Sequence, residues 1–553
     1  MHARWEVKAL RGSNLSARHA AKTVIVRPSG CLSTWKLIES ESKAKKNPRG
    51  FGGQRPPISK SHKLTKTTKS ERTGCRGMTT WKSGLSHSGH GTGWARITGK
   101  SNGTVKNQEN FVITQTLAPR LTPIRAAIAS FAFAAIAVVA IAADRPGPVT
   151  KEDPEAIRPF HVSVPEAELA QLRSRVIATK WPERETVTDQ SQGVQLATMK
   201  ALAHYWATDY DWRKCEAKLN ALPQFITEID GVDIHFIHVR SKHQHALPLI
   251  VTHGWPGSII EQLKIIDPLT NPTAHGASAS DAFDLVIPSM PGYGFSGKPT
   301  ETGWDPARIA KAWIVLMKRL GYTRFVAQGG DWGDAVSEQM ALQAPPELLG
   351  IHVNMPATVP ADIAKALQYG EAPPSGLSAE ERHAYDQLDS FYKTGLGYAI
   401  EMKNKPQTLY GIADSPIGLA AWILDHDAQS YELIARVFAG HSEGLTRDDV
   451  LDNITLYWVT GTAISSARLY WENKFAFFDP KHVTIPVAVS VFPDEIYAAP
   501  RTWTERAYPK LIYYNKLDEG GHFAAWERPQ AFSAELRAAF KLLRDDKAMV
   551  LNK

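Results

Sequence analysis

Residues 323–343 read TRFVAQGGDWGDAVSEQMALQ and indicate the fold. The apolar segment 325–328 has the composition of a short buried strand, and an amphipathic helical pattern follows the glycines. Between them stands GGDWG, residues 329–333. A sharp turn from strand to helix needs small residues around its central side chain and lifts that side chain above the sheet. The pattern predicts a nucleophile turn centred on Asp331, or alternatively a glycine-rich turn in which the Asp caps the helix.

Apolar strands alternate with amphipathic helices on both sides of this turn. Strand-like segments occupy 247–253 and 284–290 before it, and 484–492 and 510–517 after it. Such alternation predicts the α/β class, with a mostly parallel sheet covered by helices on both faces. The order of these patterns predicts a core formed by residues 246–357 and 475–545, with a helical lid, residues 358–474, inserted between its two parts.

Two further motifs lie where the strands of this sheet end. His253-Gly254-Trp255-Pro256 directly follows a strand, and such a loop can direct the Trp255 N–H at a developing oxyanion, with the Trp332 N–H as second donor. The alternative is an ordinary turn with a hydrogen-bonded histidine. His522 follows the last strand, as a catalytic base would in the chain order nucleophile, acid, base. The acid is expected after the preceding strand, where both Asp494 and Glu495 qualify.

Together these motifs resemble the microsomal-type epoxide hydrolases of the α/β-hydrolase fold. The resemblance extends from about residue 159 to about residue 543 and includes a helical N-terminal region, residues 159–245, ahead of the hydrolase core. It implies Asp331 as nucleophile, His522 as base and Glu495, not Asp494, as the acid that orients the base. The segments that carry it are THGWPGS, IPSMPGYGFSGKP, GGDWG, DSPIGLAAWI, LYWVTGTAISSARLYWEN, FPDEIYAAP and GGHFAAWERP.

The resemblance also implies two lid tyrosines that donate protons to the epoxide oxygen. One falls at Tyr470 in SSARLYWEN and the other at Tyr398 in GLGYAIEMKNKPQTL, a stretch that departs from the family pattern. Tyr392 and Tyr410 are nearby alternatives to Tyr398. Tyr457 is the alternative to Tyr470, although packing within the lid suits it better.

The implied activity is the opening of an epoxide to a vicinal diol through an ester on Asp331. The aromatic lid favours a small hydrophobic epoxide, and water is the second substrate. No metal or cofactor is expected, because the chain has neither a Cys/His cluster nor a dinucleotide-binding glycine pattern. The alternatives are a haloalkane dehalogenase, which would use halide donors instead of tyrosines, and an inactive protein that binds hydrophobic ligands.

Charge divides the chain into a basic leader and an acidic body. Residues 1–145 carry 25 Lys and Arg against 6 Asp and Glu, and the remaining 408 residues carry 39 against 50. The folded body therefore gives no support for nucleic-acid binding. Residues 1–122 are basic and of low complexity, so we expect them to be disordered or to lie upstream of the true start. Three cysteines exclude a disulfide scaffold.

A segment typical of export follows the basic leader. Residues 126–143 read AAIASFAFAAIAVVAIAA, arginines precede the run, and Ala-Ile-Ala at 140–142 is a small-x-small cleavage site. The region 123–143 is therefore predicted to be a signal peptide, for a secreted or periplasmic protein, or alternatively a single membrane anchor. A proline-rich linker, residues 144–158, joins it to the body. The sequence does not indicate an oligomeric state.

Overall fold

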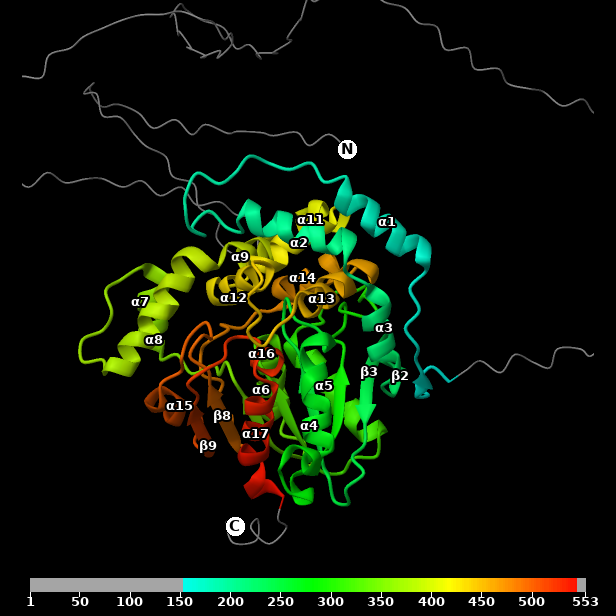
Figure 1. Cartoon of the computed structure of the whole chain (residues 1–553). Coiled ribbons are helices and arrows are strands. Elements are labelled where there is room, and N and C mark those ends of the chain that lie inside the picture. The colour runs from blue at the N-terminus through cyan, green and yellow to red at the C-terminus, as the bar shows by residue number, and fades with distance from the viewer. Residues whose placement is uncertain (1–152, 545–553) are drawn as a thin grey trace, which may run out of the picture. The chain divides into compact units, whose positions relative to one another are not determined.

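The computed structural model describes residues 153–544 (Figure 1). The predicted leader, the predicted signal peptide or anchor and most of the predicted linker lie outside these residues. Within residues 153–544, no helix is both long and apolar enough to cross a membrane.

One nine-stranded sheet organises the described part of the chain. Its strand order is β1-β2-β3-β5-β4-β6-β7-β8-β9. The strands from β5 to β9 in this order pair in parallel, whereas β1, β2, β3 and β5 pair antiparallel. The strands are β1 (Arg158–Pro159), β2 (Gln224–Ile229), β3 (Val232–Val239), β4 (Leu247–Thr252), β5 (Phe283–Pro288), β6 (Phe325–Gly329), β7 (Leu348–Val353), β8 (Val487–Val491) and β9 (Leu511–Lys516).

Helices flank this sheet, as the βα alternation predicts. The helix α5 packs against α6, and α17 packs against α4 and β8. The central strands β4 and β6 are almost wholly buried, because helices and neighbouring strands cover both of their faces. The helices of the core are α4 (Ile266–Thr270), α5 (Pro306–Arg319), α6 (Trp332–Gln343), α15 (Arg501–Ala507), α16 (Ala524–Glu527) and α17 (Pro529–Ala539).

The predicted lid is helical and lies between β7 and β8 in the sequence. It contacts the loops that follow the strands, for instance where Asn453 of the lid donates to the Pro256 carbonyl at 2.8 Å. Its helices are α7 (Ala361–Tyr369), α8 (Ala379–Ser390), α9 (Gly397–Asn404), α10 (Tyr410–Asp414), α11 (Pro416–Leu424), α12 (Ala428–Phe438), α13 (Arg447–Val459) and α14 (Ala463–Glu472).

The N-terminal region contributes to both the lid side and the sheet. Its helices are α1 (Glu166–Ile177), α2 (Leu196–Thr208) and α3 (Trp212–Asn220), and α2 packs against lid helices α11, α12 and α13 (Figure 1). Its strands β2 and β3 join the sheet through β5. The N-terminal region thus contributes strands as well as helices, and the sheet continues across residue 246. Cys215 of α3 is a free, buried thiol.

The predicted nucleophile turn is closely packed. A Cβ on Gly333 would lie 2.0 Å from the backbone oxygen of Thr252, and a Cβ on Gly329 would lie 1.9 Å from the Gly333 oxygen. Real contacts of carbon with backbone oxygen are much longer, so only glycine allows α6 to begin so close to β4 and β6.

We therefore expect Gly333→Ala to destabilise the fold by about 1–3 kcal/mol or more, because a packed backbone must move to accept the methyl group. Thermal unfolding of the purified variant measures this effect. Gly411→Ala is the matched control, because a Cβ on Gly411 of α10 would meet no atom within 4 Å. Equal losses of stability in the two variants would show that the turn is not packed as described.

Candidate active site

Asp331 occupies the centre of the turn between β6 and α6, as predicted. Its backbone has φ 52° and ψ −125°, a conformation that non-glycine residues rarely adopt. Close packing of the surrounding glycines maintains this strain, which typically occurs at functional sites. The geometry sets the Asp331 carboxylate apart from an ordinary helix cap, because the side chain makes no capping hydrogen bond to α6.

The Asp331 carboxylate is buried and meets the two predicted oxyanion donors. The Trp255 backbone N–H donates to Asp331 Oδ1 at 2.8 Å. Burial raises the pKa of Asp331, and His522 and the backbone N–H groups of Trp255 and Trp332 oppose that rise. A buried anion with few partners is a more reactive nucleophile than a solvated one, so these contacts suit covalent catalysis.

His522 and Glu495 form the second half of the predicted triad. The His522 Nδ1–H donates to Glu495 Oε1 at 2.6 Å, and His522 Nε2 lies 3.9 Å from Asp331 Oδ2. Burial lowers the pKa of His522, but Glu495 and Asp331 outweigh it and raise that pKa to about 10. Glu495 is 2% exposed, whereas Asp494 is exposed. The structure thus places Glu495, the acid that the resemblance implied, against His522 and leaves Asp494 at the surface.

One buried carboxylate that the sequence motifs do not indicate holds the loop of the base. Glu527 of α16 accepts the backbone N–H of Gly521 at 2.9 Å and that of Phe523 at 3.1 Å. These two donors stand on either side of His522, so Glu527 fixes the backbone from which the imidazole projects. In the sequence, the only indication that Glu527 holds this backbone is that it lies five residues after His522.

The two predicted lid tyrosines converge above the nucleophile. Tyr398 of α9 stacks on Trp255 with ring centroids 5.0 Å apart, and Tyr470 of α14 packs edge-on against Trp332 at 4.7 Å. The two tyrosine rings lie 6.0 Å from each other. Burial, together with the charge of Asp331, raises the pKa of both phenols well above its usual value. Both phenols are therefore neutral at physiological pH.

The other candidate tyrosines have different surroundings. Tyr457 is buried, and its hydroxyl donates to the Gly257 carbonyl at 2.7 Å. Tyr410 is 66% exposed. Tyr392 contributes to the wall of the cavity described next, but it is not one of the rings packed against Trp255 or Trp332.

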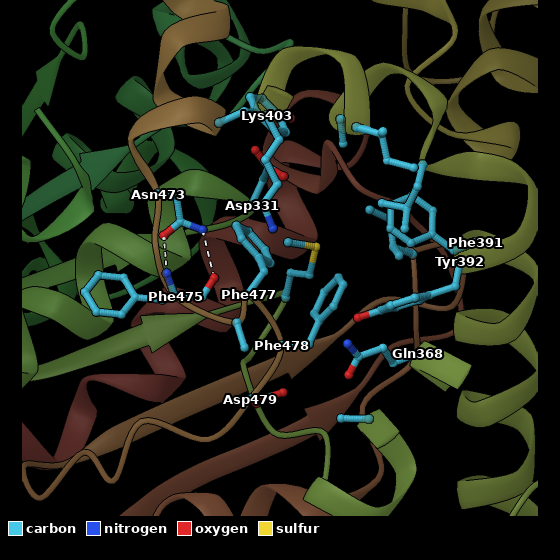
Figure 2. Close-up of a pocket in the computed structure, with 18 of the residues that line it drawn as sticks. Asp331, Gln368, Phe391, Tyr392, Lys403, Asn473, Phe475, Phe477, Phe478 and Asp479 are labelled. Carbon is cyan, nitrogen blue, oxygen red and sulfur yellow. Dashed lines mark hydrogen bonds between the residues drawn. The ribbon is translucent and has the colours of Figure 1, made fainter. Parts of the chain in front are cut away.

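A cavity of about 500 Å³ extends from Asp331 between the core and the lid (Figure 2). Its size suits a small organic molecule. Tyr398 and Tyr470 share the wall with Asp331, and Lys365 and Lys403 contribute polar groups. Most of the remaining wall is apolar, formed by residues that include Met355, Phe391, Leu396, Phe475, Phe477, Phe478 and Ile496.

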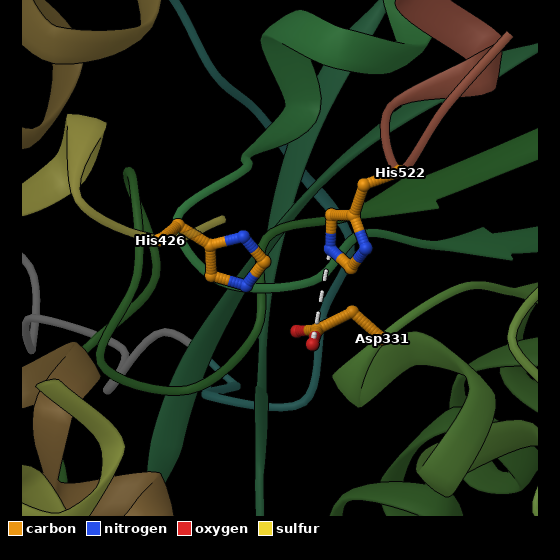
Figure 3. A group of neighbouring side chains, drawn as sticks. All are labelled: Asp331, His426 and His522. Carbon is orange, nitrogen blue, oxygen red and sulfur yellow. Dashed lines mark ion pairs between the residues drawn. The ribbon is translucent and has the colours of Figure 1, made fainter. Parts of the chain in front are cut away.

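A second histidine faces the nucleophile, and the sequence motifs gave no sign of it. His426 lies between α11 and α12, and its ring centroid is 4.5 Å from that of His522 (Figure 3). Ligand-type atoms of Asp331, His426 and His522 all lie within 4.8 Å of one another. Among residues 153–544, this trio is the group of His, Cys, Asp and Glu side chains best placed to meet around one small ligand.

The sequence matches two protein families. Residues 157–262 match "Epoxide hydrolase N terminus", and residues 248–382 match "alpha/beta hydrolase fold". Among solved structures, the juvenile hormone epoxide hydrolase of Bombyx mori is similar with a TM-score of 0.62 at 29% identity, covering 72% of this chain and 96% of that one. The Aspergillus niger epoxide hydrolase has a TM-score of 0.59 at 29% identity, covering 70% and 96%.

Two curated relatives are more similar in sequence. The "Putative epoxide hydrolase" of Stigmatella aurantiaca is 51% identical over 389 residues, which cover 70% of this chain and 86% of that protein. The "Epoxide hydrolase 1" of Oryctolagus cuniculus is 35% identical over 407 residues, which cover 70% and 89%. With the α/β-hydrolase fold and an Asp at the nucleophile turn, these similarities confirm the family and its reaction. The chain belongs to the microsomal-type epoxide hydrolases and is an enzyme that hydrolyses epoxides.

Proposed function

We propose that Asp331, Tyr398 and Tyr470 carry out the first of two steps. The observation that supports this most strongly is the placement of the buried Asp331 carboxylate opposite two neutral phenols in one apolar cavity. An Asp331 oxygen attacks a ring carbon, the carbon–oxygen bond of the epoxide breaks, and a phenol gives its proton to the departing oxygen. The product of this step is an ester between the enzyme and a hydroxyalkyl group.

In the second step, His522 activates water. Glu495 holds the imidazole through Nδ1, so that Nε2 faces the ester. Water attacks the Asp331 carbonyl carbon and gives a proton to Nε2, and the Trp255 and Trp332 N–H groups stabilise the oxyanion. The ester then breaks, its alkyl oxygen takes the proton of the new Asp331 carboxyl group, and a vicinal diol leaves while the water oxygen remains on the Asp331 carboxylate.

The charges of the site make the two steps follow in order. In the resting enzyme, the anionic Asp331 and Glu495 raise the pKa of His522 against the effect of burial, so the imidazole is protonated at neutral pH. Formation of the ester removes the negative charge of Asp331. The pKa of His522 therefore falls once the ester exists. Its proton passes to the phenolate that the first step left, and the neutral imidazole can then accept a proton from water.

The proposed substrates are small hydrophobic epoxides, including aryl epoxides. The aromatic wall of the cavity supports this class, because rings and alkyl chains are stabilised there by burial of apolar surface. We expect the full-length protein to form diols from a panel of aryl and alkyl epoxides and to release no halide from a matched haloalkane. Halide release would indicate a dehalogenase, and ligand binding without either product would indicate a binding protein.

We further propose that the protein is exported or anchored in a membrane through residues 123–143. The support is the arginine flank, the 18-residue apolar run and the Ala-Ile-Ala cleavage site in the sequence. N-terminal sequencing of the native protein tests this. A mature chain that begins just after residue 142 would indicate cleavage, an uncleaved chain in the membrane fraction would indicate an anchor, and an uncleaved chain in the soluble fraction would contradict both.

A further inference from the structure

His426 presents an imidazole to the nucleophile that the two proposed steps do not use. Its Nδ1–H donates to Asp427 Oδ2 at 2.9 Å, and its ring packs between those of Tyr398 and His522. Burial raises the pKa of Asp427, but His426 and His522 outweigh it and lower that pKa to about 2, so the carboxylate is anionic. The pair therefore has the same arrangement as His522 with Glu495, namely an imidazole oriented from behind by a buried carboxylate.

The other ring nitrogen of His426 makes no hydrogen bond. His426 is 2% exposed, and its Nε2 is buried without a partner among residues 153–544. An unsatisfied buried nitrogen costs about 1–3 kcal/mol, so its retention points to a ligand. In the neutral imidazole with its proton on Nδ1 toward Asp427, Nε2 carries the lone pair and is a hydrogen-bond acceptor.

Distances decide which ligand fits. Three atoms that lie within 4.8 Å of one another have a common point no more than about 2.8 Å from each, which is the length of a hydrogen bond to water. A tetrahedral zinc ion, bonded at about 2.0–2.2 Å, requires ligand atoms about 3.4 Å apart. His522 Nε2 and Asp331 Oδ2 are already 3.9 Å apart, so water fits this site without movement and zinc does not.

We propose that His426 positions the hydrolytic water, an inference that rests on the proposed two-step function. In the resting enzyme, protonated His522 donates to this water, which donates in turn to His426 Nε2 and to Asp331. Once the ester has formed, the water directs its two hydrogens at the two Nε2 atoms. An oxygen lone pair then faces the Asp331 carbonyl carbon. His522 takes one proton, and His426 keeps the other as a hydrogen bond.

Single-turnover kinetics of His426→Phe test the proposal, because phenylalanine keeps the ring contacts and removes the acceptor. We expect ester formation to change by less than about threefold and ester hydrolysis to slow by about 10- to 100-fold, the usual cost of lost positioning. Mass spectrometry of the intact protein should then show the ester accumulating. Both kcat and KM should fall, because the slow step follows the irreversible attack. His426→Gln retains an acceptor and should recover part of the hydrolysis rate.

Two controls separate positioning from structural damage. His441→Phe makes the same change at an exposed lid histidine and should leave both rates unchanged. The second control combines Asp427→Asn with His426→Phe, because His426→Phe alone leaves the buried Asp427 carboxylate without its imidazole partner. Asp427 caps α12 by accepting the Ser430 N–H, and an Asn at this position can still do so. The double variant should accumulate the ester in the same way.

The outcomes also distinguish this proposal from the mechanism on which it rests. His522→Ala should accumulate the ester whatever the role of His426. If His522→Ala accumulates ester and His426→Phe hydrolyses it at the normal rate, the role given to His426 is wrong. If neither variant nor the unmodified enzyme ever forms an ester, the two-step mechanism itself is wrong.

Discussion

An Asp331→Asn variant is expected to lose diol formation by a factor on the order of 10⁴ to 10⁶, since the amide lacks the carboxylate that forms the ester in the proposed mechanism. The amide has nearly the volume of the carboxylate and keeps an acceptor for the Trp255 N–H, which donates to Oδ1 at 2.8 Å. The loss would therefore reflect missing nucleophilicity and not a displaced loop. Initial rates of diol release measure it, together with the mass of the peptide that contains position 331 after a single turnover.

The same variant should not lose thermal stability. Burial raises the pKa of Asp331, which means that the fold opposes the charge that catalysis needs. Asn removes that charge and tolerates a positive φ such as the 52° found here better than most residues do. We expect an unchanged or higher melting temperature. Mass analysis must confirm that the amide persists, because an intact Asp331→Asn enzyme with normal turnover would disprove the nucleophile assignment.

The fold was largely predictable because its signals are local. The GGDWG turn needs its glycines because a Cβ on Gly329 or Gly333 would lie about 2 Å from neighbouring backbone oxygens. The strands around the turn are short apolar runs bounded by turns. What the sequence did not show was that β2 and β3 belong to the same sheet. These two strands pair antiparallel at the edge of the sheet. The alternation of apolar and polar residues predicts a strand, but it does not predict which strand is its neighbour.

The site was predictable where a residue follows a strand and only partly so elsewhere. Asp331, Glu495 and His522 stand at strand ends that a parallel sheet gathers at one edge. The choice between Asp494 and Glu495 rests on side-chain direction, since Asp494 pairs with Gly521 through its backbone while Glu495 points inward. His426 gave no signal, because its place above the nucleophile depends on the packing of the whole lid, and it is one of 19 histidines.

Replacement of both lid tyrosines, Tyr398→Phe with Tyr470→Phe, is expected to reduce the rate of ester formation by about 10³-fold or more. Each phenol is neutral and lines the cavity beside Asp331, and an opening epoxide without a proton donor must develop a full alkoxide charge in an apolar site. Stopped-flow measurement of tryptophan fluorescence follows this step, because Trp255 packs against Tyr398 and Trp332 packs against Tyr470 beside the nucleophile.

Tyr398→Phe alone and Tyr470→Phe alone should each reduce the rate of ester formation by less than half of the double variant's reduction, measured on a logarithmic scale. The ring centroids of Tyr398 and Tyr470 lie 6.0 Å apart. In the proposed mechanism both phenols serve one oxygen atom, so either is expected to replace the other in part when one is missing. Tyr410→Phe is the control, since Tyr410 is 66% exposed and should not affect the rate. A double variant that opens epoxides at the normal rate would move the donor role to Tyr392, the remaining phenol of the cavity wall. Ester hydrolysis should be almost unaffected in all of these variants, because the epoxide oxygen has already received its proton when His522 activates water.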